Sequence, residues 1–105
     1  MKNKSQITTI KKKIVPILKK NGIRKAWIFG SYVRGDYKKR SDIDILIQPP
    51  RDMSLLKFVH VKHELEEKLK EKVDLVSYRG IHPFLKNQIL KEEVKIIWKE
   101  MWIYL

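Results

Sequence analysis

Hydrophobic residues near the N-terminus recur every three or four positions, the spacing of one face of an α-helix. Five branched apolar residues follow this spacing and have lysines between them: Ile7, Ile10, Ile14, Ile17 and Leu18. Asn21-Gly22 is a stop signal, because glycine readily adopts the left-handed backbone that ends helices. Pro16 removes one helical hydrogen bond and marks a point where the helix can kink. The pattern therefore predicts an amphipathic helix that ends at Asn21-Gly22.

The rest of the chain alternates short apolar runs with longer amphipathic stretches. The runs predict buried strands, bounded by glycine, proline or charged residues; they are Ala26–Phe29, Ser41–Gln48, Val73–Ser77 and Val94–Trp98. A second amphipathic helix is expected over Ser54–Lys70, with Ser54 as its N-cap. A third is expected to start near His82-Pro83. Residues 31–40 leave room for a short helix only. The expected order is α-β-α-β-α-β-α-β.

The lengths of the connections determine how the strands pair. Residues 31–40 are too few for a comfortable parallel crossover, which needs about a dozen residues, so the first two strands are expected to be antiparallel. The second and third strands are joined through a full helix, which predicts a parallel pair with a right-handed crossover. The fold class that follows is α/β (α+β), a mixed β-sheet packed with helices.

The composition fits one globular domain over residues 1–105. The chain has 105 residues, of which 43% are hydrophobic and 34% charged, and it contains no cysteine. The missing thiols exclude disulfides, zinc-thiolate sites and cysteine nucleophiles. No apolar run approaches the ~20 residues of a membrane span, and no signal peptide is recognisable. We therefore expect a cytoplasmic protein without a membrane partner.

The positive charge is concentrated in the N-terminal part of the chain. The formal net charge is +12, and residues 1–41 hold 13 of the 24 basic side chains but only one acid, Asp36. Residues 42–105 carry equal numbers of acidic and basic side chains. Such asymmetry indicates an anionic partner: nucleic acid, nucleotide phosphates or an acidic protein. A solubilising surface explains the charge equally well.

Three aspartates are the strongest candidates for chemistry. Asp42 and Asp44 are two residues apart on an expected strand and so point to one face, while the intervening isoleucines point into the core. Asp74 lies on the next expected strand, which places it within reach of both. Carboxylates on one face repel each other unless a cation lies between them or one of them takes up a proton. Magnesium binds such ligands together with substrate phosphates. Taken alone, the Asp-x-Asp pattern is weak evidence for a metal site, because such aspartates are more often turn or cap residues.

Gly30-Ser31 follows directly after the first expected strand. Glycine lets a phosphate approach the backbone closely, and the next N–H groups and the serine hydroxyl can bind phosphate oxygens. The alternative is an ordinary strand-to-helix turn capped by serine.

These motifs together resemble the DNA polymerase β-like nucleotidyltransferase superfamily. Gly30-Ser-Tyr-Val-Arg-Gly35, Ser41-Asp-Ile-Asp-Ile45 and Lys72-Val-Asp-Leu-Val76 carry the resemblance, which covers about residues 7–98. Within that superfamily the chain looks like the minimal nucleotidyltransferases, the antitoxins of HEPN/MNT toxin–antitoxin pairs.

The resemblance implies a mechanism. Two Mg²⁺ ions would be held by Asp42, Asp44 and Asp74, and ATP phosphates by Gly30 and Ser31. Arg34 would stabilise the phosphates or pair with an acid on the short helix. The implied reaction transfers AMP from ATP to a hydroxyl, a tyrosine of a partner HEPN ribonuclease toxin. Nucleic acid is not expected as the direct substrate.

Two other functions stay open at this stage. One is a binding-only antitoxin that covers its partner without catalysis. The other is a basic nucleic-acid-binding module, which leaves the three aspartates unexplained.

The apolar C-terminus, Trp98–Leu105, either covers a sheet edge or forms a partner surface through which the chain could form a homo-oligomer. His60 and His63 are expected at the surface, and Trp27 and Phe29 in the core.

Overall fold

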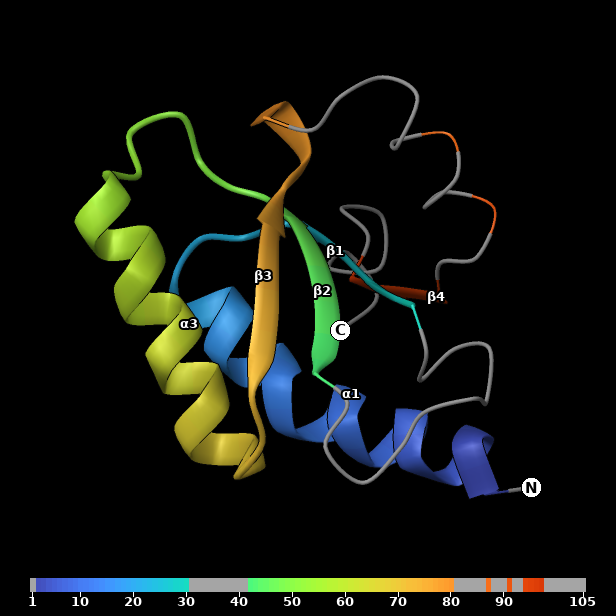
Figure 1. Ribbon diagram of the computed structural model, residues 1–105. Coiled ribbons are helices and arrows are strands. Elements are labelled where there is room, and N and C mark those ends of the chain that lie inside the picture. Colours follow the sequence, from blue (N-terminus) through green and yellow to red (C-terminus); the bar gives the residue numbers. More distant parts are fainter. Residues whose placement is uncertain (1, 31–41, 81–86, 88–90, 92–93, 98–105) are drawn as a thin grey trace.

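The computed structural model describes residues 2–30, 42–80, 87, 91 and 94–97, and the structural account concerns these residues. Figure 1 shows helices on one side of a twisted sheet. The described elements, in chain order, are α1 (Lys2–Lys20), β1 (Lys25–Phe29), β2 (Ile43–Gln48), α3 (Leu55–Leu69), β3 (Val73–Ser77), the 3-10 helix η1 (Tyr78–Gly80) and β4 (Val94–Ile97).

The four strands form a mixed sheet in the order β3-β2-β1-β4. β1 is antiparallel to both β2 and β4, whereas β2 and β3 are parallel. Both predicted pairings are therefore confirmed. The short link after β1 reverses the chain, and α3 supplies the crossover that a parallel pair requires.

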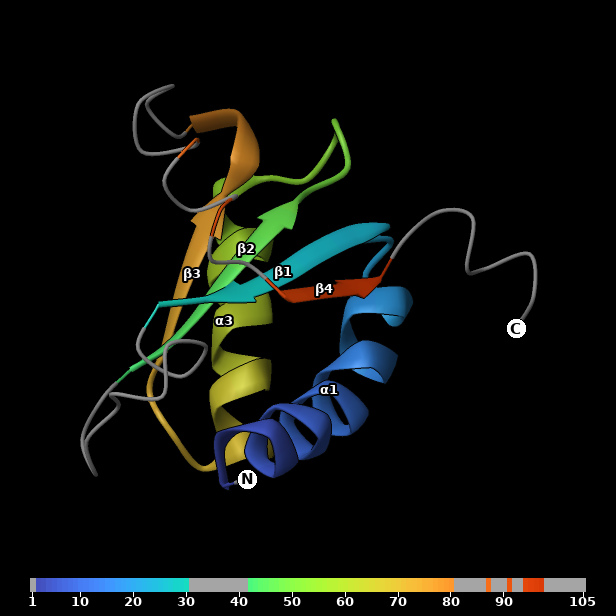
Figure 2. The same cartoon turned by 90° about the vertical axis from the view of Figure 1, so that its right-hand side faces the viewer.

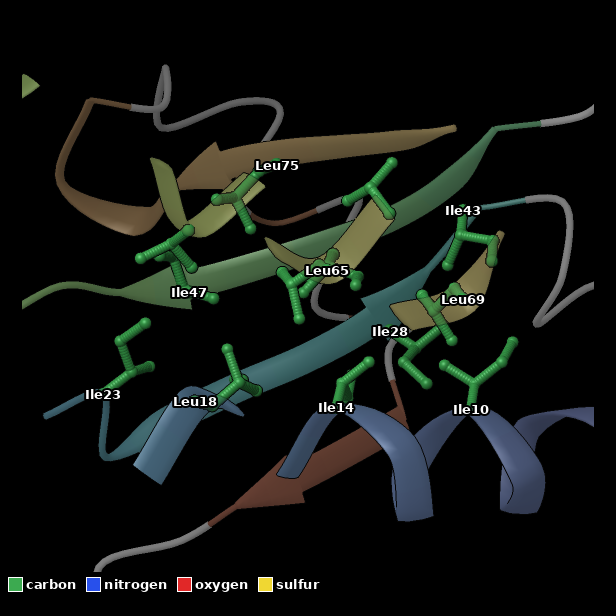
Figure 3. Packing of buried hydrophobic residues seen from close by; sticks show 14 residues of the cluster. Ile10, Ile14, Leu18, Ile23, Ile28, Ile43, Ile47, Leu65, Leu69 and Leu75 are labelled. Atoms are coloured by element: carbon green, nitrogen blue, oxygen red, sulfur yellow. The ribbon is translucent and has the colours of Figure 1, made fainter. Parts of the chain in front are cut away.

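Both described α-helices cover the same face of the sheet, as the two orthogonal views show (Figures 1 and 2). Their apolar stripes and the inward side chains of three strands form one cluster of branched residues (Figure 3). Ile14 and Leu18 of α1, Leu65 of α3, Ile28 of β1 and Ile45 of β2 are fully buried. The alternation predicted for β2 is confirmed, because Ile43, Ile45 and Ile47 all belong to this cluster.

Local sequence signals mark the end of α1 and both ends of α3, as predicted. The Asn21 side chain donates a hydrogen bond to the Ile17 carbonyl at 2.7 Å, and Gly22 takes a positive φ of 77°. The Ser54 hydroxyl accepts a hydrogen bond from the Lys57 backbone N–H at 3.1 Å, so Ser54 is the N-cap of α3. Lys70 ends α3 in the left-handed conformation, with φ 59°.

Two buried side chains lie on the face of the sheet opposite the helices. Trp27 and Leu46 occupy paired positions on β1 and β2, and neither belongs to the cluster under the helices. The Trp27 ring stacks on the ring of Tyr78 from η1, with centroids 5.4 Å apart. Trp27 is thus a core residue, as predicted, and Phe29 is half-buried.

Three expected segments lie outside the described residues: the short helix over 31–40, most of the helix beginning at His82-Pro83, and the apolar C-terminus from Trp98. Asn87 and Lys91, the two described positions between residues 81 and 93, are both helical. Among the described helices, none is long and apolar enough to cross a membrane.

An ion pair joins the two helices at one end of their contact. Lys20 of α1 binds the Glu64 carboxylate of α3, which also accepts a hydrogen bond from the Asn21 side chain at 3.3 Å. The hydrogen bond from Lys20 is the main reason why the pKa of Glu64 is lowered from its ordinary value. A lowered carboxyl pKa means that ionised Glu64 stabilises the folded state above its unfolded pKa.

We expect Glu64→Gln to lower the free energy of unfolding at pH 7 by about 0.3–1 kcal/mol, the usual range for an exposed ion pair. This difference from the wild type should vanish as the pH falls through the lowered pKa of Glu64, because the wild-type carboxylate then becomes protonated. Urea unfolding of both proteins at pH 7 and at low pH measures this difference in the free energy of unfolding. Glu67→Gln, at an exposed position of the same helix, is the matched control; an equal loss in the control at pH 7 would contradict the assignment.

Candidate active site

The glycine proposed to bind phosphate lies against one of the candidate carboxylates. Gly30 follows β1, has φ +82° and is buried. A Cβ atom built at Gly30 would lie 2.0 Å from Oδ2 and 2.9 Å from Cγ of Asp44. Any side chain at position 30 would therefore overlap the carboxylate, and its backbone conformation is one that glycine alone adopts easily. The glycine motif and the Asp-x-Asp motif meet at this contact.

The sheet brings Asp44 and Asp74 opposite each other. In the parallel register of β2 and β3, Asp44 pairs with Asp74, so the two Cα atoms sit on neighbouring strands at the same level. Directly opposed residues in a sheet project their side chains to the same face. Asp44 is half-buried, whereas Asp74 is exposed. Asp42 immediately precedes β2 and is also exposed.

Hydrogen bonds hold the start of β3 to β2 on one side and to α3 on the other. The Ile43 N–H donates to the Lys72 carbonyl at 2.9 Å, which begins the β2–β3 ladder. The Glu66 carboxylate of α3 accepts a hydrogen bond from the Val73 N–H, also at 2.9 Å. These bonds fix the backbone of the two residues before Asp74 and so set its level relative to Asp44. The sequence by itself does not indicate this role of Glu66, because the position of a carboxylate on an amphipathic helix does not reveal which group it contacts.

The donor chemistry fits a magnesium ion, since carboxylate oxygens are among its preferred ligands. Asp44 and Asp74 lie on paired positions, and Asp42 is two residues from Asp44. Within the described part of the chain, however, no three acidic or histidine side chains lie close enough together to hold a metal ion. The backbone thus places the candidate ligands on adjacent strands, and their side chains are not gathered around one point.

The other predicted residues fall into two groups. Ser31 and Arg34 lie outside the described residues, as do the basic residues 38–40 that precede Asp42. His60 and His63 are both exposed on α3, which confirms the expected surface position.

Comparison with known proteins shows the family of this chain. The family model of the polymerase beta nucleotidyltransferases matches residues 12–101. A Methanocaldococcus jannaschii protein, MJ0435, whose name describes it as a candidate protein adenylyltransferase, is 50% identical over 91 residues, covering 87% of this chain and 98% of its own length. The protein adenylyltransferase MntA of Thermococcus cleftensis is 40% identical over 75 residues, covering 71% of this chain and 76% of its own.

Solved structures share the fold. A toxin–antitoxin structure with AMP-PNP superposes with a TM-score of 0.76 at 25% identity, covering 87% of this chain and 75% of that chain. A complex of the tri-AMPylated HEPN toxin of Shewanella oneidensis with its MNT antitoxin gives a TM-score of 0.71 at 22% identity, covering 90% and 74%. With the family model matching most of its length, this chain belongs to the polymerase β nucleotidyltransferase family, where its relatives are MntA-like protein adenylyltransferases.

Proposed function

We propose that this protein transfers AMP from ATP to a hydroxyl group of a partner protein. The observation that supports the proposal is the contact between Gly30 and Asp44, which places the glycine proposed to hold phosphate beside a carboxylate paired in register with Asp74. A nucleotidyltransferase needs both parts side by side. The phosphates must be held close to the backbone, and the carboxylates must lie where the α-phosphate reacts.

The reaction is a displacement at the α-phosphorus of ATP. The acceptor hydroxyl oxygen forms a bond to that phosphorus, the bond to the β-phosphate bridging oxygen breaks, and pyrophosphate leaves. The hydroxyl proton is released as the new ester forms. When bound, Mg²⁺ would neutralise phosphate charge and activate the hydroxyl. We assign Asp42, Asp44 and Asp74 as its ligands, with two ions expected, and Asp74 as the base that would accept the hydroxyl proton.

The remaining assignments concern the nucleotide. Gly30 and Ser31 would hold the β- and γ-phosphates, because glycine lets a phosphate approach the backbone closely and the next N–H groups can bind its oxygens. Arg34 would add positive charge beside the same phosphates. These roles come from the motif Gly30–Gly35, and only Gly30 of that motif lies within the described residues.

The proposed acceptor is a tyrosine of a HEPN ribonuclease toxin, which makes this chain an antitoxin. Support comes from the resemblance of the motifs to minimal nucleotidyltransferases and from the fold shared with a toxin–antitoxin structure that holds AMP-PNP. Adding AMP to a tyrosine near a ribonuclease site adds bulk and negative charge, which would repel RNA phosphates.

Labelled ATP tests the proposal. With a HEPN protein encoded beside this chain as acceptor, and with Mg²⁺ present, label in the α-phosphate should become covalently attached to the acceptor. Label in the γ-phosphate should stay in solution as pyrophosphate, which provides the matched control. Replacing the acceptor tyrosine by phenylalanine should abolish the attachment. Neutralisation of the toxin without attached label would instead establish a binding-only antitoxin.

A further inference from the structure

A pocket lies at the end of the sheet opposite the candidate carboxylates. It has a volume of about 390 Å³ and is lined by Gly22, Arg24, Lys25, Gln48, Pro49, Pro50 and Arg79. β1 runs antiparallel to β2, so the start of β1 and the end of β2 meet there, with Lys25 paired to Gln48. Asp44 is four residues before Gln48, or about 13 Å along the strand. The pocket is therefore separate from the candidate active site.

Two turns form the walls of this pocket. The turn after α1 reaches it through Gly22, whose N–H donates to the Lys19 carbonyl at 3.1 Å. The turn after β2 contributes Pro49 and Pro50, and the Pro50 carbonyl accepts a hydrogen bond from Met53 N–H at 3.1 Å. A Cβ on Gly22 would contact the Pro50 ring at 3.5 Å, so the two turns lie side by side. These walls are formed by short, hydrogen-bonded turns on a rigid sheet.

The charges that line the pocket have one sign. Arg24, Lys25 and Arg79 come from the link before β1, from β1 itself and from η1, and among the described residues that line the pocket none is acidic. Arg24 and Arg79 are exposed, whereas Lys25 and Gln48 are half-buried. Guanidinium groups match phosphate geometry, because each can donate two parallel hydrogen bonds. The volume lies in the range of small-molecule sites, about 300–1,000 Å³.

We propose that this pocket binds the phosphate group of a nucleotide. Arg24, Lys25 and Arg79 would hold the phosphate, the Gln48 amide could hydrogen-bond to the base or the ribose, and the two proline rings offer an apolar wall. The nucleotide is either free or part of an RNA strand, which share this chemistry. The proposal is independent of the proposed function, because none of the residues assigned to AMP transfer lines this pocket.

Binding of two probes to the full chain tests the proposal, one being AMP and the other a short single-stranded RNA. Both are titrated in the presence of EDTA, so that no divalent cation assists binding at the carboxylates. Arg24→Gln combined with Arg79→Gln should weaken binding at least tenfold. Lys57→Gln with Lys62→Gln removes the same charge from α3 outside the pocket and should change the affinity by less than twofold. Thermal melting establishes that both variants are folded.

The amide signals of the wild-type protein give a second measurement that needs no variant. On addition of either probe, the N–H signals of Gly22, Gln48 and Gly80 should shift more than that of Gly30. Binding of AMP alone assigns the site to free nucleotides, and binding of RNA alone assigns it to a strand; both results support a nucleotide phosphate site. Equal weakening in both double variants, shifts centred on Gly30, or no binding at millimolar concentration would overturn the proposal.

Discussion

Replacing Asp42 and Asp44 by asparagine should reduce AMP transfer by at least about a thousandfold. A metal ion at a reacting phosphate supplies several kcal/mol of charge stabilisation, and each 1.36 kcal/mol is worth a factor of ten in rate. Asparagine keeps the size of the side chain but removes the negative charge that would hold the cation. Transfer of α-phosphate label to the partner, measured at saturating ATP, reports the loss.

The same double variant should lose a second property. In the wild type, millimolar Mg²⁺ or Mn²⁺ with ATP should raise the melting temperature, because a ligand that binds the folded state stabilises it by mass action. Asp42→Asn with Asp44→Asn should abolish that rise. Asp52→Asn is the control, since Asp52 is an exposed aspartate in the turn before α3. A melting temperature that rises equally in the double variant would rule out these aspartates as ligands.

Gly30→Ala should impair both folding stability and transfer. The backbone at φ +82° disfavours any side chain by about 1–2 kcal/mol. The new methyl group would in addition overlap the Asp44 carboxylate, and overpacking of this kind costs about 1–3 kcal/mol. Because the carboxylate must move to admit the methyl group, we expect transfer to fall at least tenfold even at temperatures where the variant is folded.

Two glycines elsewhere separate these effects. Gly22 has a similar φ of +77°, but a Cβ there meets Pro50 at an ordinary 3.5 Å, so Gly22→Ala should show the backbone cost alone. Gly80→Ala, with nothing within 4 Å of the added atom, should leave stability and transfer near the wild type. Urea unfolding of the three variants gives the comparison. Equal losses in the free energy of unfolding for Gly30→Ala and Gly22→Ala would mean that the added methyl group does not clash with the Asp44 carboxylate.

The contact also changes what is expected of bulkier residues at position 30. From the sequence, Gly30→Val is expected to block the approach of the triphosphate in a folded protein. The structure adds a direct clash with Asp44. A branched side chain in left-handed backbone beside a carboxylate should therefore destabilise the fold as well, so Gly30→Ala is the better probe of the site.

Much of the fold could be predicted from local patterns. The period of the apolar residues predicts α1 and α3, and Ser54 predicts the start of α3. The alternation of isoleucines predicts which face of β2 packs against the helices. The lengths of the connections predict the antiparallel and parallel pairings. These features depend on residues close together in the chain or on the length of a connection. Both properties can be read directly from the sequence.

Contacts between distant segments were decided by the tertiary structure. The sequence names Gly30 and Asp44, but their contact depends on the register of β1 against β2, in which Phe29 pairs with Asp44. The bond from Val73 to Glu66 depends on how α3 lies against β3. The basic pocket gathers Arg24, Gln48 and Arg79 from three separate segments, none of which carries a motif. Side chains so far apart in the sequence meet only because the register of the strands brings them to the same part of the sheet. The spacing of residues along the chain does not indicate this register.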